Sequence, residues 1–199
     1  MIIYKIIILL MSLVLHEIAH GYVAYLCGDK TAKYYGRLSL NPLKHLDPMG
    51  TILPIVMLLS GSSFVIGWAK PVPVNYWALK NEKWGEFFVA IAGSAMNFLL
   101  MIIVGLLIRF NILTFNPITS YFMVMNMLLG CFNLIPIPPL DGSRVVASFL
   151  SLENRIKVFN YDRIGLVIVI LLGYTGIISK ILMPMFRVVL KVLNFVVGS

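Results

Sequence analysis

The sequence predicts an all-α, polytopic membrane protein, and its composition carries that prediction. Of the 199 residues, 60% are hydrophobic and only 12% are charged, and the mean hydropathy is +0.93. Ordinary soluble domains are about 45–50% apolar and about 25% charged. A soluble protein of this length could not bury so much apolar surface. We therefore expect a single membrane-embedded domain over residues 1–199.

About five to six apolar segments, separated by polar stretches, define the expected helix bundle. They are Ile2–Cys27, Met49–Trp68, Phe87–Ile108, Ile118–Ile137, Ile164–Ile178 and Ile181–Val197. A span takes about 20 apolar residues. The first segment lacks a small-residue cleavage site, so we interpret it as a retained helix and not as a signal peptide. The last segment contains basic residues and is expected to lie partly along the interface.

The net charge of +8 raises the question of nucleic-acid binding. The basic residues are scattered between apolar segments and form no dense patch, so no nucleic-acid partner is expected. Membrane proteins commonly carry such an excess because cytoplasmic loops are enriched in Lys and Arg. The two cysteines, Cys27 and Cys131, show no metal or redox spacing and are interpreted as small buried side chains.

The first apolar segment contains the sequence H-E-I-A-H, whose polar residues are His16, Glu17 and His20. On a helix the two histidines are one turn apart on one face, the spacing that lets two imidazoles bind one Zn²⁺. Glu17 lies where its carboxylate can take a proton from a zinc-activated water. Each ionisable group inside a bilayer costs about 2.5–3.5 kcal/mol on insertion scales. A zinc site explains this cluster better than a solvated polar group does.

A hydrolytic zinc site needs a third protein ligand. The extended H-E-x-x-H-x-x-G-x-x-H pattern is absent, because Val23 and Leu26 occupy its later positions. The remaining candidates are Asp29, Asp47, Glu82, Glu86, Asp141, Glu153, Asp162 and His45. Asp141 is favoured because it ends the run N-L-I-P-I-P-P-L-D-G, whose prolines break helical hydrogen bonding and let the chain turn inward. The alternative for Asp141 is a simple Asp-Gly turn.

Three motifs together resemble the site-2 protease family of intramembrane zinc metalloproteases. They are H-E-I-A-H, A-G-S-A-M-N over residues 92–97, and N-L-I-P-I-P-P-L-D-G over residues 133–142. The signatures G-R-L-S-L-N-P-L-K-H-L-D-P and G-W-A-K-P-V-P-V-N are similar to the small bacterial branch. The resemblance covers about residues 9–146, which would form the catalytic core, with accessory helices over about 164–197. PDZ or CBS domains would not fit in this chain.

The resemblance implies that His16, His20 and Asp141 bind zinc and that Glu17 is the catalytic acid/base. It also implies catalytic roles for Asn97 and Asn133, which we nominate as donors to the oxyanion. For both amides an interhelical hydrogen bond is the alternative. Where the family has proline, this chain has Ser94, which bears on the local helix geometry but leaves Asn97 in register.

The zinc hypothesis constrains the topology. The histidines lie toward the end of the first segment, and Asp141 follows the Ile118–Ile137 segment, so these two helices must run in the same direction. Phe87–Ile108 supplies one crossing between them. Met49–Trp68 is therefore expected to be re-entrant or shallow, with Pro54 and Gly61 breaking it.

The basic residues support that topology. Eleven of the sixteen Lys and Arg residues then fall on one side of the membrane, in the stretches 28–48, 69–86 and 141–163. Lys5 and Arg109 fall on the other side. This bias predicts a multi-pass cell-membrane protein whose site lies in the bilayer toward the cytoplasm.

The function predicted is zinc endopeptidase activity on a peptide bond in or near the transmembrane segment of a membrane-anchored protein. The segment Lys70–Asn75 (K-P-V-P-V-N) is predicted to be extended, either holding an unwound substrate as an added strand or serving as a rigid connector. His45 and Asp47 are open between a role near the site and a loop turn. The alternative function is a non-proteolytic membrane metal carrier or chaperone, which would not need Glu17.

Overall fold

The structure is a computed structural model that describes residues 2–48, 50, 52, 56, 60 and 69–198. Within this part of the chain every regular element is a helix, and the β-type pairing is one isolated antiparallel bridge between Leu46 and Ala69. The all-α class is therefore confirmed. The expected re-entrant path of Met49–Trp68 falls almost wholly outside the described residues.

The described helices follow the apolar segments. They are α1 (Ile2–Leu26), α2 (Thr31–Tyr34), η1 (Pro42–His45), η2 (Tyr76–Ala78), α4 (Glu82–Arg109), α5 (Pro117–Asn133), α6 (Asp141–Ala147), α7 (Leu152–Asn160), α8 (Asp162–Tyr174) and α9 (Ile177–Val197). Asn81 caps α4 by accepting from the Trp84 amide at 3.0 Å. Asn116 forms a capping box with Thr119 at the start of α5, which fixes where that helix begins.

Two described helices, over residues 3–26 and 82–109, are long and apolar enough to cross a membrane. A third span is reached if α8 and α9 count as one, although the pair is bent by 84°. The bend lies at Gly176, between the two helices, and the φ of this residue, 73°, is in the left-handed region that favours glycine. Helix α5 has 17 residues and is about 26 Å long at 1.5 Å per residue, just short of a span of about 30 Å. The described helices thus supply two to three spans, and the expected five to six are not confirmed.

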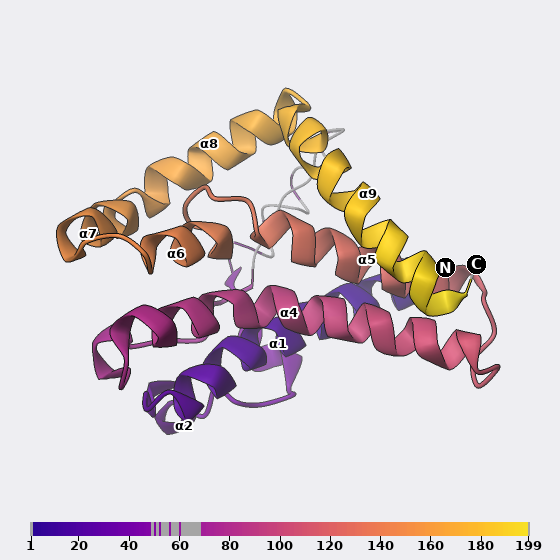
Figure 1. Cartoon of the computed structure of the whole chain (residues 1–199), viewed down its shortest axis with the longest axis horizontal. Helices are drawn as coiled ribbons and strands as arrows, with labels where there is room; N and C mark the ends of the chain where they lie inside the picture. The colour runs from indigo at the N-terminus through magenta and orange to yellow at the C-terminus, as the bar shows by residue number, and fades with distance from the viewer. Residues whose placement is uncertain are drawn as a thin grey trace.

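The central layer consists of α1, α4 and α5, which lie side by side (Figure 1). Helices α1 and α5 run in the same direction and α4 runs against them, as Figure 1 shows. This is the arrangement that the zinc hypothesis required of the first segment and of the segment before Asp141. Helix α9 turns back to pack on α4 and α5.

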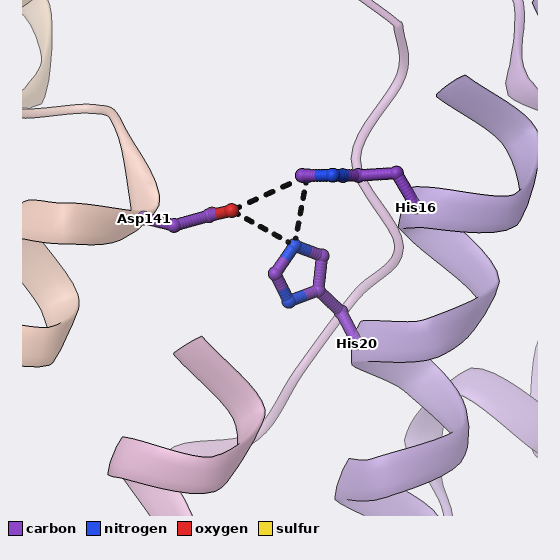
Figure 2. Close-up of side chains that lie close together, drawn as sticks. All are labelled: His16, His20 and Asp141. Carbon is purple, nitrogen blue, oxygen red and sulfur yellow. Dashed lines mark hydrogen bonds and ion pairs between the residues drawn. The ribbon is translucent and has the colours of Figure 1, made fainter. Parts of the chain in front are cut away.

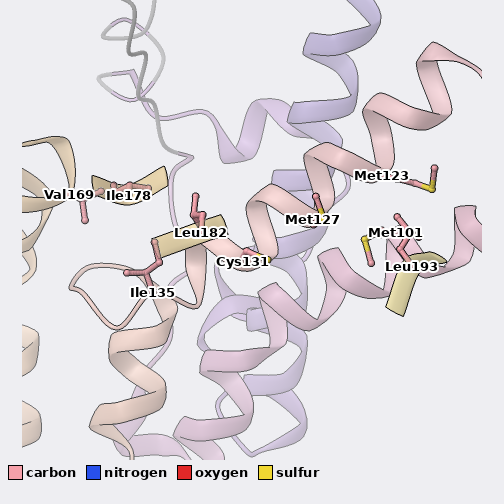
Figure 3. Packing of buried hydrophobic residues seen from close by; sticks show 9 residues of the cluster. All are labelled: Met101, Met123, Met127, Cys131, Ile135, Val169, Ile178, Leu182 and Leu193. Atoms are coloured by element: carbon pink, nitrogen blue, oxygen red, sulfur yellow. The ribbon is translucent and has the colours of Figure 1, made fainter. Parts of the chain in front are cut away.

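The largest apolar cluster lies where α8 and α9 cover this layer (Figure 3). Its buried members are Met101, Met123, Met127, Cys131, Ile135, Val169, Ile178, Leu182 and Leu193. Sulfur-containing side chains are numerous among them, and their flexibility suits the irregular gap between helices that cross at different angles. Both cysteines are free; Cys131 is buried, as expected, whereas Cys27 is only half-buried.

Helix α5 ends at Asn133, four residues before the expected end of its apolar segment. Pro136 explains the early end, because a proline disfavours helical geometry at the residue before it and has no N–H to continue the ladder. Tight turns then carry the chain into α6, with Ile137 N–H donating to Ile135 O at 2.8 Å and Leu140 N–H to Ile137 O at 2.9 Å.

Candidate metal centre

The histidine motif lies in the second half of α1. His16 and His20 are 4% and 9% exposed, and their ring centroids are 4.7 Å apart. Buried imidazoles in an apolar helix need polar partners, because an unpaired polar group is costly away from water. The two rings therefore depend on what the neighbouring helices bring to them.

The first residue of α6, Asp141, comes to the two histidines. Its Oδ2 lies 3.2 Å from the Nε2 atoms of both His16 and His20, and these two nitrogens are 3.1 Å apart (Figure 2). Ligand atoms from these residues thus form a nearly equilateral triangle. Within the described part of the chain, it is the one group of His, Cys, Asp and Glu side chains with a spacing suited to a metal ion.

The triangle fits zinc. With ligand distances of about 2.0–2.1 Å, neighbouring ligands of a tetrahedral zinc ion are about 3.3 Å apart. Two imidazoles and a carboxylate are a common catalytic zinc set, which leaves the fourth position for water or substrate. The Asp141 Oδ2 atom is buried and has no hydrogen-bond partner among the described residues. An acceptor left in this state is suited to binding a cation.

Each imidazole has a second partner that orients it. The Nδ1 of His16 lies 2.7 Å from Asn97 Oδ1, and the Nδ1 of His20 lies 2.7 Å from the Val89 carbonyl oxygen. Both partners are acceptors, so each Nδ1 carries the proton and donates it. The Nε2 lone pairs are then free for a metal, which is the usual arrangement of zinc-binding histidines.

Asn97 is part of a polar chain that crosses three helices. Its Nδ2 donates to Asn126 Oδ1 at 2.9 Å and to Ser12 O at 3.5 Å, and Asn126 Nδ2 donates to Ser12 Oγ at 3.0 Å. All three residues are fully or almost fully buried. Asn97 was expected at the site from its motif, whereas Ser12 and Asn126 were not, because their only signal is a polar side chain within an apolar segment.

Gly93 of the A-G-S-A-M-N stretch faces both histidines. A Cβ atom at this position would lie 2.3 Å from His20 Nε2 and 2.5 Å from His16 Nε2. The absence of a side chain therefore creates the space that the two rings occupy. The motif is visible in the sequence, but this role of its glycine becomes visible only in the structure.

Glu17 is near the histidines but outside the triangle. Its Oε2 accepts a hydrogen bond from the Val72 N–H at 2.7 Å, and its side chain lines the same cavity as His16, His20 and Asp141. The cavity has a volume of about 610 Å³. The backbone of the Lys70–Asn75 segment thus holds the carboxylate that was expected to act as acid/base.

The Lys70–Asn75 segment is free of helix and is attached at both ends. Arg37 donates to the Lys70 carbonyl at 2.8 Å, and the buried Asp29 accepts from the Asn75 N–H at 2.7 Å. The Lys70 N–H donates to His45 O at 2.8 Å. Because Pro71 and Pro73 have no N–H, an added strand would have to pair with the edge that carries the Lys70 and Val72 amides, and both of these amides are already bonded.

The remaining nominated residues lie in different settings. Asn133 is half-buried, lines the cavity and donates to Leu129 O at 3.0 Å. His45 is buried in its loop, 2.8 Å from Ser39 O, and Asp47 accepts from the Gly50 N–H at 2.8 Å. These contacts favour the loop-turn interpretation of His45 and Asp47.

The rest of the cavity wall is mostly apolar. It includes Val74, Leu129, Phe132, Leu166 and Val169, with Tyr76 and the charged residues Arg144, Asp162 and Arg163 completing the wall. Burial raises the pKa of Tyr76 to about 12, so its hydroxyl remains protonated at neutral pH. The centre therefore opens into an apolar chamber with a polar section contributed by η2, α6 and α8.

Comparison with known proteins agrees with the site. The profile of peptidase family M50 matches residues 4–115 and 110–174. YwhC of Bacillus subtilis, named as a zinc metalloprotease, is 38% identical over 194 residues, which cover 92% of this chain and 85% of YwhC. Rip2 of Mycolicibacterium smegmatis, also named as a zinc metalloprotease, is 29% identical over 180 residues, covering 86% of this chain and 66% of Rip2. No solved structure matches the chain.

The family profile covers most of the chain, and so does the match to YwhC. The membrane character predicted from composition agrees with the long apolar helices. The chain belongs to peptidase family M50, the site-2 protease family, and is a membrane zinc metalloprotease.

Proposed function

We propose that this protein is an intramembrane endopeptidase that hydrolyses a peptide bond in or near the transmembrane segment of a membrane-anchored protein. The observation that carries the proposal is the triangle of His16, His20 and Asp141 facing an apolar cavity between helices. A soluble substrate would gain little from an apolar chamber, whereas an unwound apolar segment would be desolvated there.

The three residues of the triangle would hold the metal. Bound there, Zn²⁺ supplies a Lewis acid for the peptide carbonyl and lowers the pKa of water toward about 7. Glu17 takes the proton of the attacking water and returns it to the leaving amine. The Val72 N–H keeps the Glu17 carboxylate at the cavity wall, where it faces the attacking water.

The two amides have different roles in this proposal. Asn133 lines the cavity and is the better candidate donor to the oxyanion, since its Nδ2 is held only by the Leu129 carbonyl. Asn97 is buried behind His16 with both amide atoms bonded. Its contacts favour a positioning role through His16 over the oxyanion role nominated from the sequence.

The proposed topology is multi-pass, with the active site toward the cytoplasmic side. The common direction of α1 and α5 (Figure 1) and the charge bias of the polar stretches support it. In this arrangement residues 1–199 form one membrane-embedded domain, with a core at about 9–146 and accessory helices at about 164–197.

The test is co-expression with a panel of tagged single-span membrane proteins. Glu17→Gln should retain zinc and lose cleavage by about 100-fold or more, because it removes the proton acceptor without removing a ligand. Glu153→Gln, an exposed residue paired with Lys157 on α7, is the matched control and should cleave normally. Equal cleavage by wild type and Glu17→Gln with zinc present would contradict the mechanism.

A binding-only membrane protein is the alternative, and the same experiment separates the two. A carrier or chaperone would bind zinc equally well in all three proteins and would cleave no member of the panel. The position of Glu17 in the cavity wall supports the enzyme, because metal binding alone requires no such carboxylate.

A further inference from the structure

The cavity wall also carries a charged pair that is separate from the metal ligands. Arg144 follows Asp141 by three residues in α6, and Asp162 is the first residue of α8. Arg144 Nη2 forms an ion pair with Asp162 Oδ2, and both side chains line the cavity. The pair thus joins the helix that carries Asp141 to the C-terminal helices.

The ion pair leaves one polar atom of each side chain without a hydrogen-bond partner among the described residues. Arg144 Nη1 and Asp162 Oδ1 are both buried, and neither has a hydrogen-bond partner in the described ranges 2–48 and 69–198. The guanidinium carbon of Arg144 lies 4.0 Å from the centre of the Phe159 ring, which holds the plane of the group. A fixed donor and a neighbouring acceptor therefore remain without a partner at the cavity wall.

This donor and acceptor complement the N–H and C=O of one residue in an extended chain, which point to the same side. A substrate segment that unwinds in an apolar chamber presents carbonyl oxygens and N–H groups that the wall of Leu129, Phe132, Leu166 and Val169 cannot bond. Arg144 Nη1 can donate to a carbonyl, and Asp162 Oδ1 can accept from an N–H.

We propose that Arg144 and Asp162 form a subsite that binds the backbone of the unwound substrate close to the scissile bond. The inference rests on the proposed function. Arg144 is less than one helical turn from Asp141, and an extended chain advances about 3.3 Å per residue, so the bound residue lies roughly two to four residues from the cut. The subsite recognises main-chain atoms, so it selects substrates that unwind there, whatever their side chains.

The test uses a synthetic single-span peptide in detergent micelles, with single amide-to-ester replacements along the segment flanking the cut. Each ester removes one N–H donor. With wild-type protein, one ester position should lower kcat/KM about 10- to 100-fold, the value of one hydrogen bond to a charged group. With Asp162→Ala the same ester should have no further effect. Arg144→Met, which keeps the aliphatic stem, should raise KM about 10-fold with zinc content unchanged.

The exposed ion pair of Lys157 and Glu153 provides matched controls on α7. Lys157→Met and Glu153→Gln should leave both KM and the ester pattern unchanged. If the pair were only a structural link between α6 and α8, Asp162→Ala would lower kcat/KM by the same factor for every ester peptide. If every ester costs the same in wild type and in Asp162→Ala, the subsite is wrong.

Two further measurements keep the result interpretable. If Asp162→Ala does not fold, Asp162→Asn and Arg144→Lys replace the two variants, and both should recover part of the KM. Binding of the same peptides to Glu17→Gln protein, measured by fluorescence anisotropy, needs no turnover. Ester-sensitive binding without cleavage by wild type would overturn the proposed function and leave the subsite standing; cleavage without an ester-sensitive position would do the reverse.

Discussion

The two sides of the metal centre are built differently. On the histidine side, α1 meets α4, and the rings of His16 and His20 are oriented by separate hydrogen bonds to Asn97 and to the Val89 carbonyl. On the aspartate side, Asp141 has no such partner among the described residues and is placed by the path of the chain. The histidine side thus depends on hydrogen bonds to the imidazoles, and the aspartate side depends on the conformation of the backbone around Asp141.

The backbone shape depends on close contact at the residue after the ligand. A Cβ on Gly142 would lie 2.2 Å from the Leu134 carbonyl oxygen and 2.6 Å from the Ile135 carbonyl oxygen. Main-chain atoms of a tight turn cannot move aside as side chains can. We therefore expect substitutions on the histidine side to lower zinc affinity gradually, and a substitution at Gly142 to abolish zinc binding.

The largest effect is expected from Gly142→Ala. Because the new methyl group meets backbone, the turn must open and Asp141 must leave the triangle, so we expect neither zinc nor activity in the purified protein. Metal analysis after purification measures this. Gly105→Ala is the matched control in α4, where the Cβ would meet only side-chain ends of Leu193 and Val197 at 3.2 Å. Zinc retained by Gly142→Ala would refute the contrast between the two sides.

Gly93→Ala should rank second. Its Cβ would meet the imidazoles themselves, at 2.3 Å and 2.5 Å, but these rings can rotate away. We expect zinc affinity to fall by about 100-fold, the upper range for a perturbed ligand environment, while the protein still folds. Competition with a fluorescent chelator gives the affinity, and thermal unfolding in detergent checks the fold. An affinity within 3-fold of wild type would mean that the rings are not packed against this glycine.

Asn97→Ala should weaken zinc binding by about 10- to 100-fold, because His16 loses the acceptor that fixes its tautomer and ring orientation. Asn133→Ala sharpens the assignment, since it should keep zinc affinity and lower kcat. The pair is measured by chelator competition and by initial rates on the same peptide. The opposite pattern would exchange the two roles.

The smallest effect is expected from Asn126→Ala, which leaves His16 bonded to Asn97 but removes the nearer of the two acceptors of the Asn97 Nδ2. Zinc affinity should fall only about 3-fold. The ratio of the Asn97 and Asn126 effects, from the same chelator assay, measures how far the polar chain transmits order. Equal losses would show that the chain acts as one unit.

Much of this architecture follows from the sequence. The helical spacing of His16 and His20, the small polar motif with Asn97 and the turn before Asp141 were each visible, and the common direction of α1 and α5 followed from bringing them together. Helix α5 was expected to reach Ile137, and Pro136 is the local signal for its earlier end at Asn133.

Other features were not visible, for physical reasons. The bonds of Ser12 and Asn126 depend on how α1 and α5 are rotated toward α4, and helical periodicity in an all-round apolar segment does not define that rotation. The Val72 bond to Glu17 joins residues that are 55 positions apart through a main-chain amide. A donor that every residue except proline carries cannot be recognised from residue type.

The Val89 carbonyl that holds His20 has a consequence for which substitutions near the site can disturb that ring. In an α-helix the carbonyl of residue 89 points toward residue 93, and Gly93 leaves it open to the imidazole. The acceptor belongs to the main chain, so substitution at position 89 cannot delete it. A side chain added at position 93 therefore disturbs the orientation of His20, whereas any residue at position 89 that fills the same pocket still supplies the acceptor.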